Sequence, residues 1–272
     1  MLDDPFDPFV DLAGLAEDSD AAVIGPRDSR VQEVDTTRFP WNTVVYLCRD
    51  FGNGKCAGCS GALVSPTRVL TAAHCIFSLK RMRAPRSIRV IPGRRDRNTL
   101  PFGAIPSTEY WIPRAFRDGP SRMVNDWGVI VLPRPFPELR RFMPLRPLSD
   151  AALDRLRARG LVTVAGYPSD RPLGTLWRHG ERLVRFDAKR LRYTVDTCPG
   201  HSGSPIILGI GSAPAVIGVH TAGVLDAESR PFGCKRETVM APAGAVNSGM
   251  RLTPAMVAAV RDPRGSGLLR LP

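Results

Sequence analysis

The chain lacks any apolar run that could cross a membrane, since no stretch approaches the roughly 18 residues that a spanning helix needs. Aromatic residues are also scarce, at 7%, whereas the chain has 25 glycines and 26 prolines. A composition this dense in turn-forming residues disfavours a helical bundle and favours many short strands. We therefore expect no membrane span and a β-rich protein whose 43% of apolar residues can build a sizeable core.

Basic side chains are absent from residues 1–22, which contain seven acidic residues. The whole chain has a formal charge of +12, so this segment carries −7 and the remainder carries +19. The segment also lacks the basic start and continuous apolar centre of a secretory signal, so no signal peptide is evident in it. An acidic segment ahead of a basic body indicates a leader that can lie against the body, with a solvated tail as the alternative.

The sequence lacks the motifs of several kinds of ligand-binding and catalytic site. The nearest approach to zinc spacing is Cys56-x-x-Cys59, which has no second half, so we expect no metal and no cofactor. The stretch Lys80–Arg97 is strongly basic but has no interleaved aromatics. We interpret it as a solvated surface loop and expect no nucleic acid partner. The hydrolase elbow Gly-x-Ser-x-Gly is also absent at the serine loop, because position 204 is serine.

Short apolar or β-rich runs recur along the chain, and turn residues separate most of them. This pattern predicts a sandwich or barrels. The runs are Thr43–Leu47, Gly61–Val64, Arg68–Thr71, Ile88–Ile91, Trp127–Leu132, Leu161–Gly166, Leu191–Val195, Ser204–Leu208 and Val216–His220. Two short helices are expected, over Ser149–Arg159 and Thr253–Val260, each with its first residue as the cap. Between the two halves, Pro133–Leu148 holds five prolines and is typical of a linker.

Three local motifs supply the side chains of a nucleophilic hydrolase. They are Thr71-Ala72-Ala73-His74-Cys75, Asn125-Asp126-Trp127-Gly128-Val129-Ile130 and Cys198-Pro199-Gly200-His201-Ser202-Gly203-Ser204-Pro205. A serine hydroxyl needs a base, imidazole has a suitable pKa, and a buried carboxylate fixes the imidazole tautomer. His74, Asp126 and Ser202 occur in the His, Asp, Ser order of the chymotrypsin barrels. The N–H groups of Gly200 and Ser202 are the candidate oxyanion hole.

Two of the remaining histidines, His179 and His201, are not candidates for catalysis. We expect His179 to lie at the surface and His201 to shape the loop before the nucleophile.

These motifs resemble those of trypsin-like serine proteases, and the chain is most similar to the bacterial glutamyl endopeptidases among them. The closer resemblance rests on Val23-Ile24-Gly25-Pro26 with Asp35-Thr36-Thr37, on Val164-Ala165-Gly166-Tyr167-Pro168, on Gly203-Ser204-Pro205 and on Val216-Ile217-Gly218-Val219-His220. It implies an all-β fold, a chymotrypsin-like double six-stranded β-barrel with short helices, including one at the C-terminus. It further implies an acidic propeptide over residues 1–22, a first barrel over 23–135 and a second barrel over 136–272.

The resemblance also implies how the six cysteines pair, which the sequence alone leaves open. The implied bridges are Cys48–Cys56, Cys59–Cys75 and Cys198–Cys234. An even number of cysteines suits an oxidising compartment, so we expect a secreted or periplasmic protein.

Substrate specificity is implied by three further matches. Val23 matches the mature N-terminal residue whose α-ammonium contacts a substrate glutamate, and Thr197 and His220 match two residues that bind the same carboxylate. A buried carboxylate needs such donors and a compensating charge. The resemblance thus implies a zymogen from which an activating protease removes residues 1–22, and protein or peptide substrates as partners.

Asp196 departs from that pattern. In trypsin-like enzymes its position holds the aspartate that selects Arg or Lys, and an aspartate would repel a glutamate. Either Asp196 points elsewhere or the enzyme cleaves after basic residues. We favour cleavage after Glu, because Val23, Thr197 and His220 agree with each other. A third hypothesis is a catalytically silent protease-like module that binds partners through its basic face.

Overall fold

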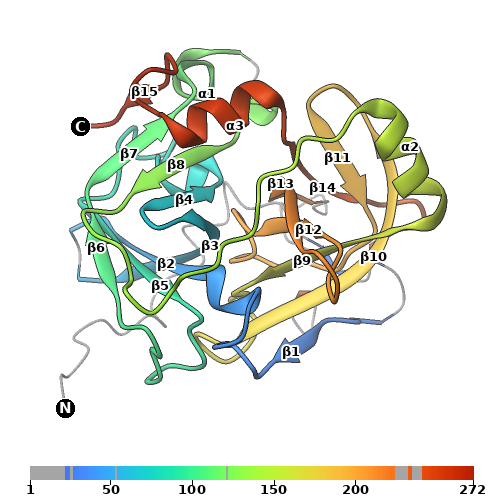
Figure 1. The fold of residues 1–272 in the computed structure, drawn as a ribbon, viewed down its shortest axis with the longest axis horizontal. Helices are drawn as coiled ribbons and strands as arrows, with labels where there is room; N and C mark the ends of the chain where they lie inside the picture. The colour runs from blue at the N-terminus through green and yellow to red at the C-terminus, as the bar shows by residue number, and fades with distance from the viewer. Residues whose placement is uncertain (1–21, 25–26, 53, 121, 224–231, 235–240) are drawn as a thin grey trace.

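The structure is a computed structural model that describes residues 22–24, 27–52, 54–120, 122–223, 232–234 and 241–272. The expected acidic leader therefore lies outside the described residues, except for Ala22. Strands dominate and form two sheets, which lie side by side in Figure 1. None of the helices in the described ranges has the length and hydropathy of a membrane-spanning segment.

The first sheet has eight strands in the order β15-β7-β8-β4-β3-β2-β5-β6. Every neighbouring pair is antiparallel. The sheet curls into a half-barrel, and no strand pairing joins its two edges within the described chain. Its strands are β2 (Val44–Asp50), β3 (Cys56–Ser65), β4 (Arg68–Thr71), β5 (Ser87–Pro92), β6 (Ile105–Ser107), β7 (Glu109–Ile112), β8 (Gly128–Val131) and β15 (Leu269–Arg270).

The second sheet follows the order β1-β10-β11-β14-β13-β12-β9, and an additional β10–β9 pairing closes six of its strands into a barrel. The remaining strand, β1, adds to the outside of β10. The strands are β1 (Val31–Glu33), β9 (Leu161–Gly166), β10 (Leu176–Phe186), β11 (Arg190–Tyr193), β12 (Pro205–Leu208), β13 (Ala215–Ala222) and β14 (Asn247–Arg251). The expected chymotrypsin-like β architecture is confirmed, with one closed barrel and one curled half-barrel.

Both expected helices are present and begin where the sequence predicts. The Ser149 hydroxyl accepts the N–H of Ala152 at 3.3 Å, and the Thr253 hydroxyl accepts that of Met256 at 3.2 Å. The last helix and β15 return to the first sheet, as Figure 1 shows. The helices are α1 (Arg114–Asp118), α2 (Asp150–Arg159) and α3 (Pro254–Arg261), with short 3-10 turns η2 (Trp41–Thr43), η3 (Ala73–Cys75) and η4 (Arg122–Val124).

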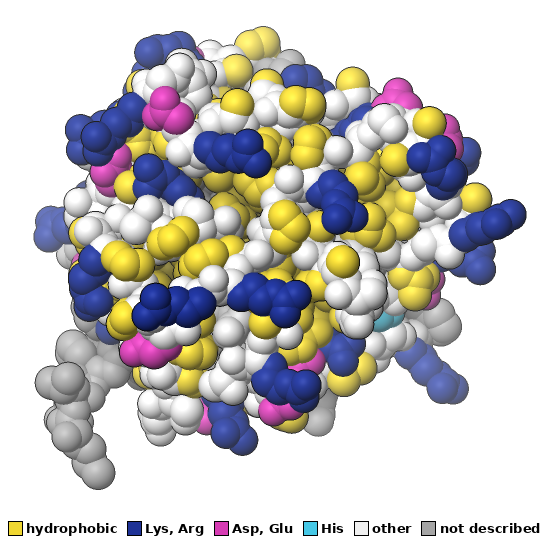
Figure 2. Space-filling model, in the orientation of Figure 1, with side chains coloured by type: hydrophobic (Ala, Val, Ile, Leu, Met, Phe, Trp, Pro, Cys, Tyr) yellow, Lys and Arg dark blue, Asp and Glu magenta, His cyan; other side chains and the backbone are white. Residues whose placement is uncertain are grey.

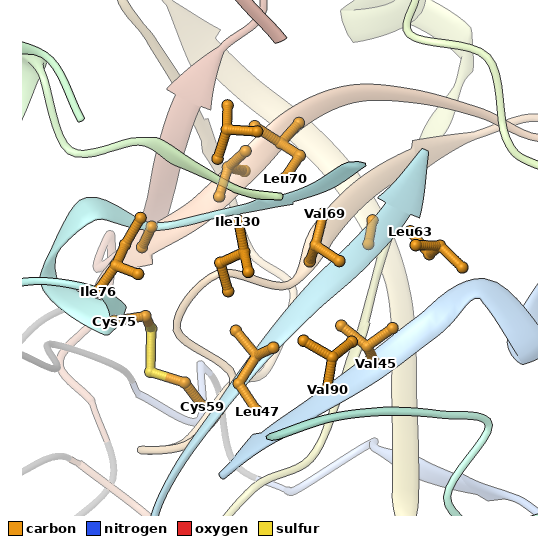
Figure 3. Packing of buried hydrophobic residues seen from close by; sticks show 14 of the residues in the cluster. Val45, Leu47, Cys59, Leu63, Val69, Leu70, Cys75, Ile76, Val90 and Ile130 are labelled. Carbon is orange, nitrogen blue, oxygen red and sulfur yellow. A yellow bond between two sulfur atoms is a disulfide. The ribbon is translucent and has the colours of Figure 1, made fainter. Parts of the chain in front are cut away.

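Aliphatic side chains fill the concave side of the first sheet (Figure 3). Val45, Leu47, Val69 and Ile130 are all fully buried there, and each contributes roughly 1.5–3 kcal/mol by leaving water. The Cys59–Cys75 bridge joins β3 to η3 at the edge of this cluster. The turn that carries His74 is therefore fixed to a packed core.

All six cysteines are bridged, in the pairs Cys48–Cys56, Cys59–Cys75 and Cys198–Cys234. This is the pairing that the family resemblance implies.

The proline-rich connection between the sheets has no helix or strand in it. It is not a free linker, because Phe136, Leu139 and Met143 are buried in the main core. The backbone also pairs with β13, since Arg146 N–H donates to the Val216 carbonyl at 2.8 Å.

The basic stretch Lys80–Arg97 is only partly the solvated loop that its charge predicts. It contains β5, and Arg94 is just 4% exposed. The Arg94 guanidinium donates to the carbonyls of Asp96 and Arg97 at 2.9 and 2.7 Å. These hydrogen bonds stabilise the turn that follows β5. Other Lys and Arg side chains are spread over the surface in Figure 2, with few acidic ones between them.

Candidate active site

The histidine and the aspartate meet at one edge of the first sheet. His74 follows the end of β4, and Asp126 precedes the start of β8, its antiparallel neighbour. The His74 Nδ1 lies 2.7 Å from Oδ2 of Asp126, and the His74 backbone N–H donates to Oδ1 at 3.0 Å. Both residues are 4% exposed. The carboxylate therefore fixes the imidazole ring and keeps its proton on Nδ1.

The serine comes from the second sheet, in the loop between β11 and β12. Its carbonyl accepts the N–H of Ser60 on β3 at 2.9 Å, and the sulfur of Cys75 lies 3.4 Å from the same oxygen. These contacts place Ser202 beside the residue that follows His74. The Ser202 hydroxyl is buried and has no hydrogen-bond partner among the described residues. The chain segments that carry the three predicted residues thus come together where the two sheets meet.

The loop before the serine presents backbone N–H groups. The Pro199 carbonyl accepts the N–H of Ser169 at 2.7 Å, so the N–H of Gly200, across the same trans peptide, points the opposite way. Gly200 has φ 98°, and a Cβ there would lie 2.5 Å from the Tyr167 carbonyl oxygen. A side chain at position 200 would therefore clash with the backbone, which accounts for the glycine.

His220 and Thr197 present buried polar atoms with no partner in the described part of the chain. These are Nε2 of His220 and Oγ1 of Thr197, and both residues are 0% exposed. Nδ1 of His220 lies 2.7 Å from the Tyr193 hydroxyl. Donation from that hydroxyl to Nδ1 leaves the proton of the ring on Nε2. Burial, with the nearby charges of His74 and Arg190, lowers the pKa of His220 to about 3, so the ring is neutral.

The carboxylate of Asp196 is occupied by the N-terminal segment. It accepts the backbone N–H groups of Ile24 and Ser29, each at 2.7 Å. Burial raises the pKa of Asp196, and these two N–H groups oppose the rise. The Asp196 carboxylate is thus engaged by the N-terminal segment, and this arrangement favours the first of the two alternatives that the sequence left open.

His179 lies beside Asp196, so its predicted place at the surface is wrong. Its Nδ1 accepts the Asp196 backbone N–H at 2.8 Å. The same Nδ1 lies 3.4 Å from Oδ2 of Asp196.

Val23 is fully buried and packs against the Cys198–Cys234 bridge. Its N–H donates to the Phe232 carbonyl at 2.9 Å. The preceding carbonyl, of Ala22, accepts the N–H of Thr197 at 3.0 Å. The structure therefore brings Val23 next to Thr197, although 174 residues separate them in the chain.

A buried ion cluster holds the residues that follow Val23. The guanidinium of Arg30 lies 2.6 Å from a carboxylate oxygen of Asp28 and 2.6 Å from one of Asp170. Burial opposes the Arg30 charge, but its bonds to the two carboxylates outweigh burial and raise its pKa. Burial, and then the charge of Arg30, lowers the pKa of His201 well below its usual value, and His201 Nδ1 accepts the Cys198 N–H at 3.1 Å. His201 thus shapes the nucleophile loop in its neutral form.

Arg190 connects the aspartate loop to the barrel. Its guanidinium donates to the Met123 carbonyl at 2.5 Å and to the hydroxyls of Thr221 and Ser248 at 3.2 and 2.5 Å. Burial lowers the pKa of Arg190, and the charges of Tyr193 and Asp126 oppose that fall. The local sequence around Arg190 does not indicate this role, because its partners Thr221, Ser248 and Met123 lie 31, 58 and 67 positions away in the chain.

The sulfurs of Cys59 and Cys75 lie close to a nitrogen of His74, as in many metal sites. Both sulfurs belong to one disulfide, and metal ions bind thiolates. This donor set does not suit a metal ion.

Known proteins resemble this chain in sequence and in fold. A family model described as Trypsin matches residues 29–238. Glutamyl endopeptidase of Bacillus licheniformis is 30% identical over 219 residues, which are 79% of this chain and 65% of that protein. Glutamyl endopeptidase of Staphylococcus epidermidis is 29% identical over 210 residues, 75% of this chain and 67% of that protein. The chain thus spans about two thirds of the length of these relatives.

Among solved structures, one of a Glu endopeptidase in complex with MPD superposes with a TM-score of 0.70 and 23% identity. The match covers 89% of this chain and 99% of that one. At this identity the likeness describes the fold.

Proposed function

This chain belongs to the trypsin family of serine proteases, and we propose that it cleaves peptide bonds after glutamate once the segment ahead of Val23 has been removed. The chain is a trypsin-like serine endopeptidase, similar to glutamyl endopeptidases. Beyond this family membership, we propose the specificity of the enzyme, the way it is activated and the roles of individual residues.

We assign the chemical step to His74, Asp126 and Ser202. His74 takes the proton of the Ser202 hydroxyl as that oxygen attacks the peptide carbonyl. The N–H groups of Gly200 and Ser202 bind the oxyanion, and each is worth about 3 kcal/mol in the transition state. His74 then gives its proton to the leaving amine, and water releases the acyl group by the same steps. Asp126 orients the imidazole and stabilises the imidazolium throughout.

The preference for glutamate rests on Thr197 and His220, and their unpartnered buried atoms carry the proposal. A buried donor without an acceptor costs about 1–3 kcal/mol, so these atoms favour a ligand that accepts hydrogen bonds. A carboxylate does so with two oxygens. The rival specificity for Arg or Lys needs a free Asp196 carboxylate, which here is bonded to Ile24 and Ser29.

Activation follows from the place of Val23. While Val23 is bonded to Ala22 it has a neutral amide, and cleavage would create an ammonium next to Thr197. Since His220 is neutral, that ammonium would provide the positive charge that a buried carboxylate needs. We propose residues 1–22 as the propeptide, 23–135 and 136–272 as the two barrels, and an activating protease as a partner. The three disulfides support a secreted or periplasmic site of action.

The test compares Thr197→Val with the parent, in the chain that begins at Val23. This change removes one hydroxyl at nearly constant volume. We expect kcat/KM to fall about tenfold or more on a peptide with Glu before the scissile bond, and less on the matched Gln peptide. Thr36→Val is the matched control, because the Thr36 hydroxyl is also buried and unpartnered within the described ranges. Equal losses on both peptides would contradict the assignment.

A second measurement separates an enzyme from a silent binding module. A fluorophosphonate probe should label the processed parent and fail to label Ser202→Ala. An unlabelled, folded parent would contradict the catalytic assignment.

A further inference from the structure

The carbonyl oxygen of Ala22 occupies a buried position on which two donors converge. The N–H of Thr197 reaches it at 3.0 Å, and Nδ2 of Asn247 reaches it at 2.6 Å. Oδ1 of Asn247 in turn accepts the N–H of Ala22 at 3.1 Å. All three residues are 0% exposed. One buried side chain therefore holds the residue just before the proposed cleavage point as a neighbouring strand would.

One hydrogen bond of the Asn247 side chain does not involve Ala22. Its Nδ2 also donates to the Val195 carbonyl at 2.8 Å, so one amide hydrogen is fixed by the barrel and the other points at Ala22.

Asn247 also shares a face of the barrel with His220. On β14, Gly249 pairs with His220, and Asn247 pairs with Tyr193 of β11. Residues two apart on a strand share a face, and directly paired residues point to the same side. The hydrogen bond between Tyr193 and His220 agrees with this placement. The donors that hold Ala22 thus belong to the same cluster as the proposed acid-binding side chains.

Removal of Ala22 would deprive Thr197 N–H and Asn247 Nδ2 of a shared acceptor. Thr197 Oγ1 and His220 Nε2 already have none among the residues described. Each buried donor without an acceptor is unfavourable, and four of them would then lie in one cluster. A carboxylate has enough lone pairs to satisfy all four.

We infer that Asn247 is a specificity-determining residue, whose Nδ2 binds the side-chain carboxylate of a substrate glutamate at the position that the Ala22 carbonyl holds in the uncut chain. This inference rests on the proposed function, namely cleavage before Val23 and preference for glutamate. Ala22 is then a built-in occupant of the acid-binding site. The same amide blocks that site before cleavage and binds substrate afterwards.

The test measures kcat/KM of Asn247→Ala, in the chain processed to begin at Val23, on matched peptides with Glu or Gln before the scissile bond. A hydrogen bond to a charged group is stronger than one to a neutral group, so cleavage after Glu should fall about 10- to 100-fold and cleavage after Gln by less. The Glu/Gln ratio should drop about tenfold. Ser248→Ala is the matched control, because Ser248 is the next residue on β14, faces the other side and bonds to Arg190. It should keep the ratio.

Fluorophosphonate labelling of Ser202 shows which variants are folded. If Asn247→Ala does not label, Asn247→Asp keeps the size of the side chain and replaces the donor with an acceptor. It should then lower the Glu/Gln ratio even further.

A structural role alone would lower cleavage of both peptides by the same factor and would overturn the inference. A parent enzyme without preference for Glu over Gln would overturn the proposed specificity and this inference together. A parent preference that survives in Asn247→Ala would overturn the inference alone. As a second readout, a product peptide ending in Glu should slow labelling of the processed chain and leave labelling of the full chain unchanged. Equal protection of both chains would show that Ala22 does not occupy the site.

Discussion

The carboxylate of Asp196 accepts the backbone N–H of Ile24 at 2.7 Å, across 172 positions of the chain. The other oxygen does the same for Ser29. An aspartate that could select basic substrates instead anchors the segment following Val23. The N-terminal segment and the proposed acid-binding site are thus linked through one buried side chain, next to Thr197.

Asp196→Asn should leave the preference for the residue before the scissile bond unchanged and should lower stability. The amide can accept only one of the two N–H groups, so we expect a loss of about 2 kcal/mol in the free energy of unfolding. Chemical unfolding measures the loss, and peptides with Glu or Arg measure the preference. Arg cleavage that is present in the parent and absent from the variant would show that Asp196 faces the substrate after all.

Asp126→Asn should lower kcat by about 10⁴-fold while leaving KM close to that of the parent, because the amide stabilises the wrong imidazole tautomer. The His74–Asp126 contact of 2.7 Å is the basis for this expectation. Steady-state kinetics on a Glu peptide tests it, with circular dichroism as the check on folding. A loss of less than about tenfold would mean that Asp126 does not orient the histidine.

Arg190→Met should lower kcat by a similar factor on Glu and Gln peptides, about tenfold, because Arg190 acts through the loop that carries Asp126. The variant loses three hydrogen bonds, including the one to the Met123 carbonyl. Arg190→Lys should recover part of the loss. A selective effect on the Glu peptide would instead show that the charge of Arg190 acts on the substrate carboxylate.

His220 should make the protein less stable in acid. Its pKa is about 3 in the folded chain and close to 6.5 when unfolded, so the unfolded state binds the proton first. The stabilising contribution is complete above pH 6.5 and is lost as the pH falls toward 3, with a slope of at most about 1.4 kcal/mol per pH unit.

Chemical unfolding of the parent and of His220→Gln, between pH 7 and about 4, measures that contribution. Other buried histidines act equally in both proteins, so the difference isolates His220. The parent should lose stability faster than the variant. Parallel curves would mean that His220 has the same pKa in the folded and unfolded states, so that folding does not lower it.

The parts of the fold that could be predicted from sequence are those with strong local patterns. The strand Arg68–Thr71 and the strand Leu161–Gly166 have the predicted bounds, and both helix caps are where Ser149 and Thr253 indicate. By contrast, β10 was not predicted, because its apolar residues do not alternate with the polar ones and most of its residues are only partly buried or exposed. Its position is set by pairing with β9, β11 and β1, which no local pattern records.

The residues of the candidate site also fall into two groups, those with a local sequence motif and those without one. The motifs around His74, Asp126 and Ser202 are local, and sequence reasoning found them. The roles of Asn247, His179 and Arg190 come from contacts across the barrel, such as the one between Asn247 and Ala22 over 225 positions. A lone asparagine at the start of a glycine-containing strand carries no local signal for that contact.

The measurement that tests the account most directly compares the full chain with the chain that begins at Val23, on matched peptides with Glu, Asp, Arg or Lys before the scissile bond. We predict cleavage after Glu that appears only with the free Val23 terminus and disappears in Ser202→Ala. Equal cleavage after Glu by the uncut chain would contradict the activation scheme. Cleavage after Arg or Lys would contradict the acid-binding site, and no cleavage by either chain would contradict the assignment as an active protease.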